Sequence, residues 1–270
     1  FPVIYNTMTV YDNLAFPLRC REFTKEKIEE RVKAVSDTLN LSSFLNSPAR
    51  KLTADQKQLI SLGRGLVRED VAAVLMDEPL TVIDPDLKFR LRRNLKEINE
   101  QYKTTLVYVT HDQNEAMTFA ENIIVMDQGE IVQVGFPKDL FERPKTTFVG
   151  YFIGSPAMNL FESEVLTDFE VKVESIKIKT NSNLSKLKDK KVKLGIRSEF
   201  IDIAENDGEN TFKAKVNRVE DFGNFKLITA NIGSKIIKSK IEREKPVTEG
   251  QVNLYIPPEK CCVYVDDKLI

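Results

Sequence analysis

The sequence lacks several features that would point to a specialised class of protein. Forty basic residues face 41 acidic ones, for a formal net charge of -1, which argues against a main partner that is a nucleic acid. No apolar run approaches the roughly 20 residues that a membrane-spanning helix needs. The three cysteines, Cys20, Cys261 and Cys262, match no metal-ligand spacing, and we expect reduced thiols in the cytosol. What remains is an ordinary globular composition in 270 residues, a length sufficient for two domains.

Three helices are predicted in the first half of the chain. Apolar residues recur at intervals of three and four between residues 24 and 39, which is typical of an amphipathic helix. The run Thr53-Ala54-Asp55-Gln56 has the form of a capping box and predicts that a second helix begins there. Asp84 followed by Pro85 predicts a third, with a capping side chain and then a proline in the first turn.

Short apolar runs between these helices predict strands. The runs over 71–76 and 105–109 contain only apolar side chains or nearly so, and we expect both strands to be buried on both faces. A third run, 123–126, is joined by a Gly-containing turn to 131–134 and predicts a hairpin. Alternating helices and strands predict an α/β domain with a mainly parallel sheet.

The pattern changes after Phe152. Residues 154–157 read as a linker, and beyond them come short strands separated by polar turns, with no convincing helix. This texture predicts a small β-barrel or sandwich of about 110 residues. We therefore place a domain boundary between residues 153 and 154, with an α/β domain over 1–153 and a β-rich domain over 154–270.

Two acidic residues, Asp77 and Glu78, follow the first predicted strand. In α/β proteins ligands bind at the carboxyl ends of strands, where one carboxylate can hold Mg²⁺ and the next can polarise a water. Acids at a strand end are more often loop acids or helix caps. His111, the only histidine, follows the next predicted strand. A lone histidine is more often structural, but at this place its imidazole can hydrogen-bond a γ-phosphate.

Several motifs resemble, in order and spacing, those of the ATPases of ABC transporters. Residues 52–56 resemble the signature motif, 75–80 the Walker B strand, Asp84 the D-loop and 108–117 the H-loop. Three further segments are similar to the maltose- and glycerol-phosphate-type importer ATPases: 8–14, 152–159 and 194–199.

This resemblance implies ATP and Mg²⁺ as cofactors and a role for each candidate residue. Asp77 would be the magnesium-side carboxylate, Glu78 would activate water, and His111 would sense the γ-phosphate. The other candidates reach a second ATPase subunit or its nucleotide across a dimer: Thr53, Ala54, Asp55, Gln56 and Asp84.

The resemblance also implies an organisation and a set of partners. Residues 1–153 would be the ATPase domain and 154–270 an OB-like regulatory domain, whose fold should not be read as nucleic-acid binding. The helix beginning at Thr24 would contact transmembrane permease subunits, which places the protein at the cytoplasmic face of the membrane. An ABC protein of DNA repair or translation is disfavoured by the β-rich second half and by the lack of basic clusters.

The sequence departs from this family first in its phosphate-binding loop. No G-x-x-x-x-G-K-[ST] run is present, although its backbone N–H groups and lysine would hold the phosphates. The chain opens Phe1-Pro2-Val3 without an initiating Met, inside what reads as a loop. We expect the sequence to be a piece of a longer chain and to be inactive by itself.

The second departure is in the signature motif. The family's Leu-Ser-Gly-Gly-Gln is Leu52-Thr53-Ala54-Asp55-Gln56 here. Ala54 adds a methyl group that limits close approach of the backbone, and Asp55 places a carboxylate where the partner's γ-phosphate should bind. Two readings stay open. Intact Glu78 and His111 favour a transport ATPase, with one degenerate half-site in an asymmetric heterodimer. The altered signature keeps a non-catalytic regulatory subunit as the alternative.

Overall fold

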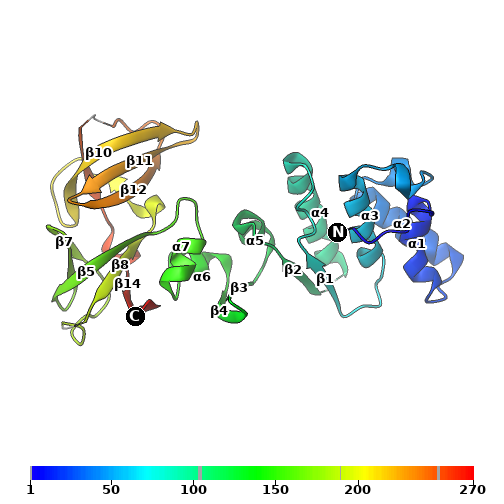
Figure 1. The fold of residues 1–270 in the computed structure, drawn as a ribbon, viewed down its shortest axis with the longest axis horizontal. Helices are drawn as coiled ribbons and strands as arrows, with labels where there is room; N and C mark the ends of the chain where they lie inside the picture. Colours follow the sequence, from blue (N-terminus) through cyan, green and yellow to red (C-terminus); the bar gives the residue numbers. More distant parts are fainter. Residues whose placement is uncertain (1, 103–104, 189, 248–249) are drawn as a thin grey trace. The chain divides into compact units, whose positions relative to one another are not determined.

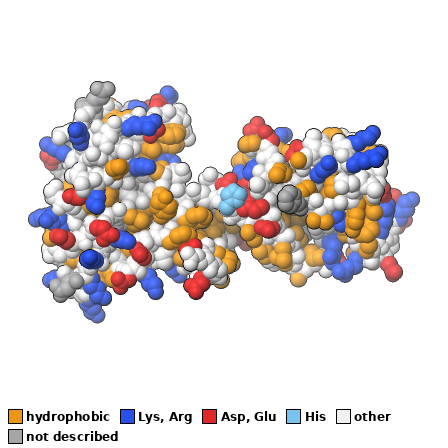
Figure 2. Space-filling model, in the orientation of Figure 1, with side chains coloured by type: hydrophobic (Ala, Val, Ile, Leu, Met, Phe, Trp, Pro, Cys, Tyr) orange, Lys and Arg blue, Asp and Glu red, His pale blue; other side chains and the backbone are white. Residues whose placement is uncertain are grey.

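A computed structural model of the chain describes residues 2–102, 105–188, 190–247 and 250–270. The chain divides into two compact units, Phe1–Ala120 and Glu121–Ile270 (Figure 1). No helix in these four described stretches is long and apolar enough to cross a membrane. Basic and acidic side chains are interspersed over the face in Figure 2.

The first unit is largely helical, with one pair of strands. Its helices are α1 (Val10–Arg19), α2 (Lys25–Thr38), α3 (Ala54–Leu66), α4 (Pro85–Tyr102) and α5 (Gln113–Phe119), with short 3₁₀ turns η1 (Ser42–Phe44) and η2 (Ala49–Lys51). Its strands are β1 (Ala73–Asp77) and β2 (Thr105–Val109). The three predicted helix starts are confirmed: Thr24 caps α2, Thr53 caps α3 in a complete capping box, and α4 begins at Pro85. Helices α1 and α5 were not predicted, although Thr9 and Asp112 cap them.

Strands β1 and β2 pair in parallel, from Ala73 opposite Thr105 to Asp77 opposite Val109. One face of the pair packs on a core built by α1 to α4, and Met76 lies in that core. The other face is open: Leu75 is 77% exposed, and Val107 and Val109 are also exposed. The prediction that both strands are buried on both faces is therefore wrong, because the described helices of this unit cover only one side of the pair.

The second unit begins with a hairpin and two short helices. The hairpin joins β3 (Ile123–Asp127) to β4 (Glu130–Gly135) in antiparallel register, as predicted, and α6 (Pro137–Glu142) and α7 (Thr147–Phe152) follow. Beyond Phe152 the described residues form strands and two short 3₁₀ turns, η3 (Ser198–Phe200) and η4 (Pro258–Lys260).

Two antiparallel sheets enclose the core of the second unit. One sheet has the order β15-β14-β8-β5-β6-β7 and the other β12-β11-β10-β13-β9. The first contains β5 (Asn159–Thr167), β6 (Glu170–Val173), β7 (Ile176–Lys179), β8 (Val192–Ile196), β14 (Cys262–Val265) and β15 (Lys268–Leu269). The second contains β9 (Asp202–Ile203), β10 (Thr211–Asp221), β11 (Phe225–Ile232), β12 (Lys235–Glu242) and β13 (Gln251–Tyr255). Inward-facing side chains of both sheets share one core, as expected for the small barrel or sandwich that the short strands predicted. The boundary placed at 153/154 from sequence stays a prediction about independent domains.

A buried arginine ties α6 and α7 to the first of these sheets. Arg197 follows β8 and is 0% exposed. Its guanidinium donates to the carbonyl of Phe141 at 2.9 Å, to that of Gly150 at 2.8 Å and to that of Ile153. Gly154 has a φ of +103°, and a Cβ there would lie 2.7 Å from Arg197 Nη1. A side chain at position 154 would therefore meet both backbone strain and the guanidinium.

Candidate functional site

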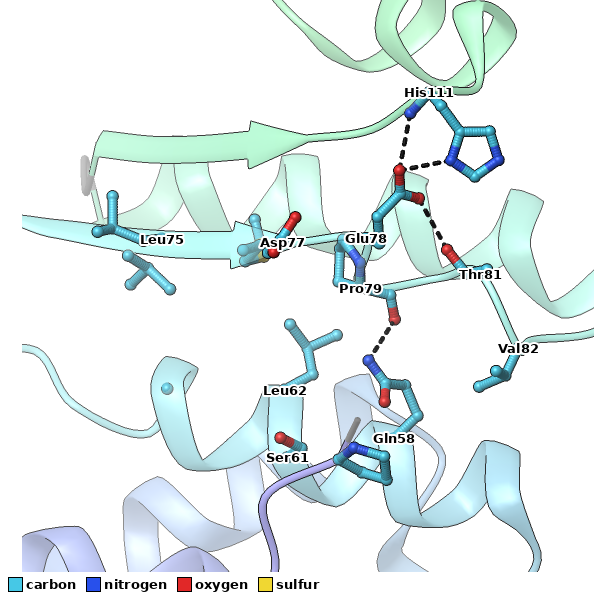
Figure 3. Close-up of a pocket in the computed structure, with 14 residues that line it drawn as sticks. Gln58, Ser61, Leu62, Leu75, Asp77, Glu78, Pro79, Thr81, Val82 and His111 are labelled. Atoms are coloured by element: carbon cyan, nitrogen blue, oxygen red, sulfur yellow. Dashed lines mark hydrogen bonds and ion pairs between the residues drawn. The ribbon is translucent and has the colours of Figure 1, made fainter. Parts of the chain in front are cut away.

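The parallel pairing of β1 and β2 brings Glu78 and His111 together at the ends of the two strands. The backbone N–H of Glu78 donates to the carbonyl of Val109 at 2.9 Å, which extends the ladder by one residue. His111 then approaches the Glu78 carboxylate twice. Its backbone N–H donates to Oε1 at 3.0 Å, and its Nδ1 lies 2.5 Å from the same oxygen (Figure 3).

Glu78 is further fixed by Thr81 and by its own backbone. The Thr81 hydroxyl donates to Oε2 at 2.8 Å. Glu78 also has a φ of +48°, a left-handed conformation that costs a residue with a Cβ free energy and recurs at functional sites. The carboxylate is thus oriented by three hydrogen bonds in an unusual turn.

The two partners shift each other's pKa in opposite directions. Burial by itself would raise the pKa of Glu78, but hydrogen bonds from His111 and Thr81 outweigh it, so the pKa lies below its ordinary value. The hydrogen bond to Glu78, and then its negative charge, raise the pKa of His111. The imidazole (pale blue in Figure 2) is 76% exposed, so solvent reaches its other nitrogen. Together the shifts favour an ionised carboxylate beside a protonated imidazole.

A cavity of about 530 Å³ lies between the end of β1 and α3. Among its lining residues are Asp77, Glu78 and His111, with Gln58 and Ser61 opposite on α3 (Figure 3). The Gln58 side-chain amide donates to the carbonyl of Pro79 at 3.0 Å and so fixes α3 to the turn after β1. Three of the sequence-predicted site residues therefore share one cavity, which Thr53, Ala54, Asp55, Gln56 and Asp84 do not line.

Asp77 fits the requirements of a magnesium ligand. It is exposed and lines this cavity, and among the described residues its carboxylate forms neither a hydrogen bond nor an ion pair. Mg²⁺ is held in proteins by one or two carboxylates and completes its shell with water and phosphate oxygens. No group of three His, Cys, Asp or Glu side chains in the described stretches could hold a metal by itself, so a cation here would depend on such additional oxygens.

The N-terminus of α3 already carries an anion of its own. Thr53 caps the helix: its hydroxyl accepts from the N–H of Gln56 at 3.4 Å, and its own N–H donates to the Gln56 side chain at 3.1 Å. The Thr53 hydroxyl also donates to the carboxylate of Asp55 in the first turn. Because that end of a helix attracts negative charge, Asp55 occupies the surroundings that a phosphate would otherwise favour.

Asp84 ends the segment that joins β1 to α4. The Asp84 carboxylate accepts from the N–H of Asp86 at 3.0 Å and its carbonyl from the N–H of Lys88 at 2.8 Å. Asp84 therefore directly precedes α4 and accepts from an N–H of its first turn, as predicted for a capping residue. Its own carboxylate is exposed.

One buried carboxylate in the first unit was not expected from sequence. Glu115 lies in the first turn of α5 and is only 3% exposed. Four side chains from β2, the turn after it and α4 surround it: Tyr108, Thr110, Lys88 and Arg92. The only signal for it in the sequence is its place three residues after Asp112, the cap of α5.

Comparison with known proteins agrees with the β-rich unit. The family model described as "MalK OB fold domain" matches residues 154–201. The oligosaccharides import ATP-binding protein MsmX of Bacillus subtilis is 37% identical over 257 residues, covering 92% of this chain and 70% of the relative.

Two further relatives have different solutes in their names. The trehalose/maltose import ATP-binding protein MalK of Thermococcus litoralis is 36% identical over 278 residues, covering 98% of this chain and 74% of the relative. The sn-glycerol-3-phosphate import ATP-binding protein UgpC of Yersinia enterocolitica is 35% identical over 261 residues, covering 94% and 72%. With motifs, strand ends and β-rich unit in agreement, the chain belongs to the ATP-binding subunits of the maltose/glycerol-phosphate group of ABC-type importers.

Proposed function

We propose that this subunit hydrolyses ATP and couples ATP binding and hydrolysis to the import of a carbohydrate, polyol or related solute. Its partners would be transmembrane permease subunits and a second ATPase subunit, at the cytoplasmic face of the membrane. The observation that carries the proposal is Glu78, held at the end of β1 beside His111 in a cavity that Asp77 also lines. The import ATP-binding relatives support the same activity.

Each residue of the site would have a separate role in hydrolysis. ATP with Mg²⁺, when bound, supplies the phosphoryl group and the cation that neutralises it, with Asp77 on the cation side. Glu78 orients a water and accepts its proton. An ionised carboxylate has about four acceptor positions, and the three bonds to Glu78 leave one of them for that water. His111 lies within the same cavity and would contact the γ-phosphate through its exposed ring nitrogen.

The altered signature supports a degenerate second half-site. A signature segment serves the nucleotide of the partner subunit, so Asp55 would face a phosphate bound there. Two unit negative charges 4 Å apart repel by about 4 kcal/mol at an effective dielectric near 20. Asp55 is partly exposed, so screening would reduce the penalty to about 1–2 kcal/mol. We therefore infer an asymmetric heterodimer in which the partner supplies an intact signature to this subunit's own site.

A non-catalytic regulatory subunit is the alternative, and Asp55 is the observation that favours it. Under that alternative the chain completes or regulates a partner's site and hydrolyses nothing itself. The oriented Glu78 argues against it, because a site without catalytic duty has no chemical need of a carboxylate held in a strained turn. The two functions differ in whether Glu78 affects turnover.

Replacing Glu78 by Gln in the complete protein, assembled with its permease and partner, tests the proposed activity. The amide keeps the shape of the side chain but cannot accept a proton from water. We expect the ATPase rate to fall by about 100- to 10,000-fold, the usual contribution of a general base. An unchanged rate would exclude this subunit as the hydrolytic one and favour the alternative.

Restoring glycine at Ala54 and Asp55 in the same assembly tests the degenerate half-site. The double variant A54G/D55G removes the methyl group and the charge, and we expect ATP to bind about tenfold more tightly at the partner's half-site, the equivalent of about 1.4 kcal/mol. Asp139→Asn is the matched control, because Asp139 is also an exposed acid in a first helical turn but lies in the other unit. An affinity for ATP at that half-site that stays within twofold of the parent would count against a degenerate half-site.

The ion pair between Glu78 and His111 predicts a defined titration. Because the pKa of His111 is raised and that of Glu78 is lowered, the pair persists between the two values. It is lost as pH falls through the pKa of Glu78 or rises through that of His111. We expect the NMR titration midpoint of His111 to lie above the ordinary value of about 6.5 and Glu78→Gln to move it back toward that value. Thr81→Val is the control, since it leaves the Glu78 charge in place. A His111 midpoint that is unchanged in Glu78→Gln would show that the pair does not form in solution.

A further inference from the structure

We propose that Glu115 is a positioning residue that holds His111 in place and links it to the helix following Asp84. The proposal rests on the proposed function, in which His111 contacts the nucleotide. It adds a residue outside the cavity that determines where the imidazole lies.

Four polar side chains surround the buried Glu115 carboxylate, two at each of its oxygens. Oε2 accepts from the Tyr108 hydroxyl at 2.7 Å and from the Thr110 hydroxyl at 3.2 Å. Oε1 accepts from Lys88 Nζ at 3.3 Å and lies 3.9 Å from Arg92 Nη1. One oxygen thus faces β2 and the turn after it, and the other faces α4.

The N-terminus of α5 does not need the Glu115 carboxylate as a cap. Asp112 already caps α5, accepting from the N–H groups of Asn114 and Glu115 at 2.8 and 3.3 Å. A buried carboxylate is costly unless it is paired and hydrogen-bonded, and two cations from α4 provide that pairing. Burial raises the pKa of Tyr108, and its bond to Glu115 adds to the effect, so the phenol remains a donor. The carboxylate therefore serves to join three segments.

His111 lies at the end of this chain of contacts. The Thr110 hydroxyl donates its proton to Glu115 and accepts from the N–H of Asp112 at 3.0 Å. It therefore ties together the two residues on either side of His111. The direction of the Thr110 hydroxyl, and with it the turn that carries the imidazole, depends on an acceptor at Glu115.

The same carboxylate reaches Asp84 through Lys88. The N–H of Lys88 donates to the Asp84 carbonyl at 2.8 Å, and its ammonium group donates to Glu115 at 3.3 Å. A shift of Asp84 and the first turn of α4 therefore displaces a cation that Glu115 holds. This continuous set of contacts, from Asp84 through Lys88, Glu115 and Thr110, joins the turn before α4 to the turn at His111.

Lys88→Met is the sharpest test, because two explanations predict opposite signs for it. If Lys88 acted on His111 only through its charge, removing that positive charge would raise the pKa of the imidazole. If Lys88 acts through the position of Glu115, the turn loosens, contact with Glu78 weakens, and the midpoint falls. We expect a lower NMR midpoint for His111 in Lys88→Met. Glu115→Gln lowers the midpoint under either explanation, because the Glu115 charge itself raises the pKa of His111. The matched control is Glu97→Gln, an exposed acid of α4 paired with Arg93.

Kinetics in the complete assembly give a second readout. We expect Glu115→Gln to lower kcat about tenfold with KM within twofold, and to add nothing to the loss caused by His111→Ala, because both changes act through the imidazole. An unchanged or raised midpoint in Lys88→Met, or equal losses with and without His111, would overturn the proposal. The titration does not require hydrolysis, so it still decides on Glu115 if Glu78→Gln shows that this subunit is not the hydrolytic one.

Discussion

The in-register parallel pairing of β1 and β2 is the constraint on which the site depends. With Asp77 opposite Val109, the next residue of each segment leaves the sheet at the same edge. Glu78 extends the ladder by bonding to Val109, and its carboxylate then meets both the backbone and the ring of His111. A shift of one residue would turn the acidic side chains to the other face. The backbone hydrogen bonds of this pairing therefore determine which side chains meet at the site.

Two carboxylates of the first unit, Glu78 and Asp55, lie in different surroundings. Glu78 is oriented by donors and lies in a cavity, where a carboxylate can act on a water. Asp55 lies at the start of α3, where it is paired with the helix cap and stabilises the helix. The two carboxylates thus differ in their surroundings: donors hold Glu78 in the cavity, and Asp55 occupies a helix N-terminus that a phosphate would otherwise favour. This difference supports a functional asymmetry between the two sites of a dimer.

Much of this could be predicted from sequence because the determinants are local. The capping box at 53–56 and the Asp84-Pro85 start depend on neighbouring residues, and two short apolar runs joined by a Gly-containing turn determine the hairpin of β3 and β4. The exposed face of the β1–β2 pair, with Leu75 and Val107, could not be predicted, because an apolar run does not indicate which segments pack on each face of its strand. Glu115 was missed for a related reason. Its partners Lys88 and Arg92 are distant in sequence, and only the packing of α4 against α5 brings them to it.

The central claim is that the half-site built on Glu78 turns over and the half-site built on Asp55 does not. Photoaffinity labelling with an azido-ATP, trapped during turnover in the assembled transporter, tests it by showing which ATPase subunit carries the label. Label on the subunit that contains Glu78, with little on its partner, is the predicted result. Equal labelling of both ATPase subunits, or labelling of the partner alone, would contradict the account.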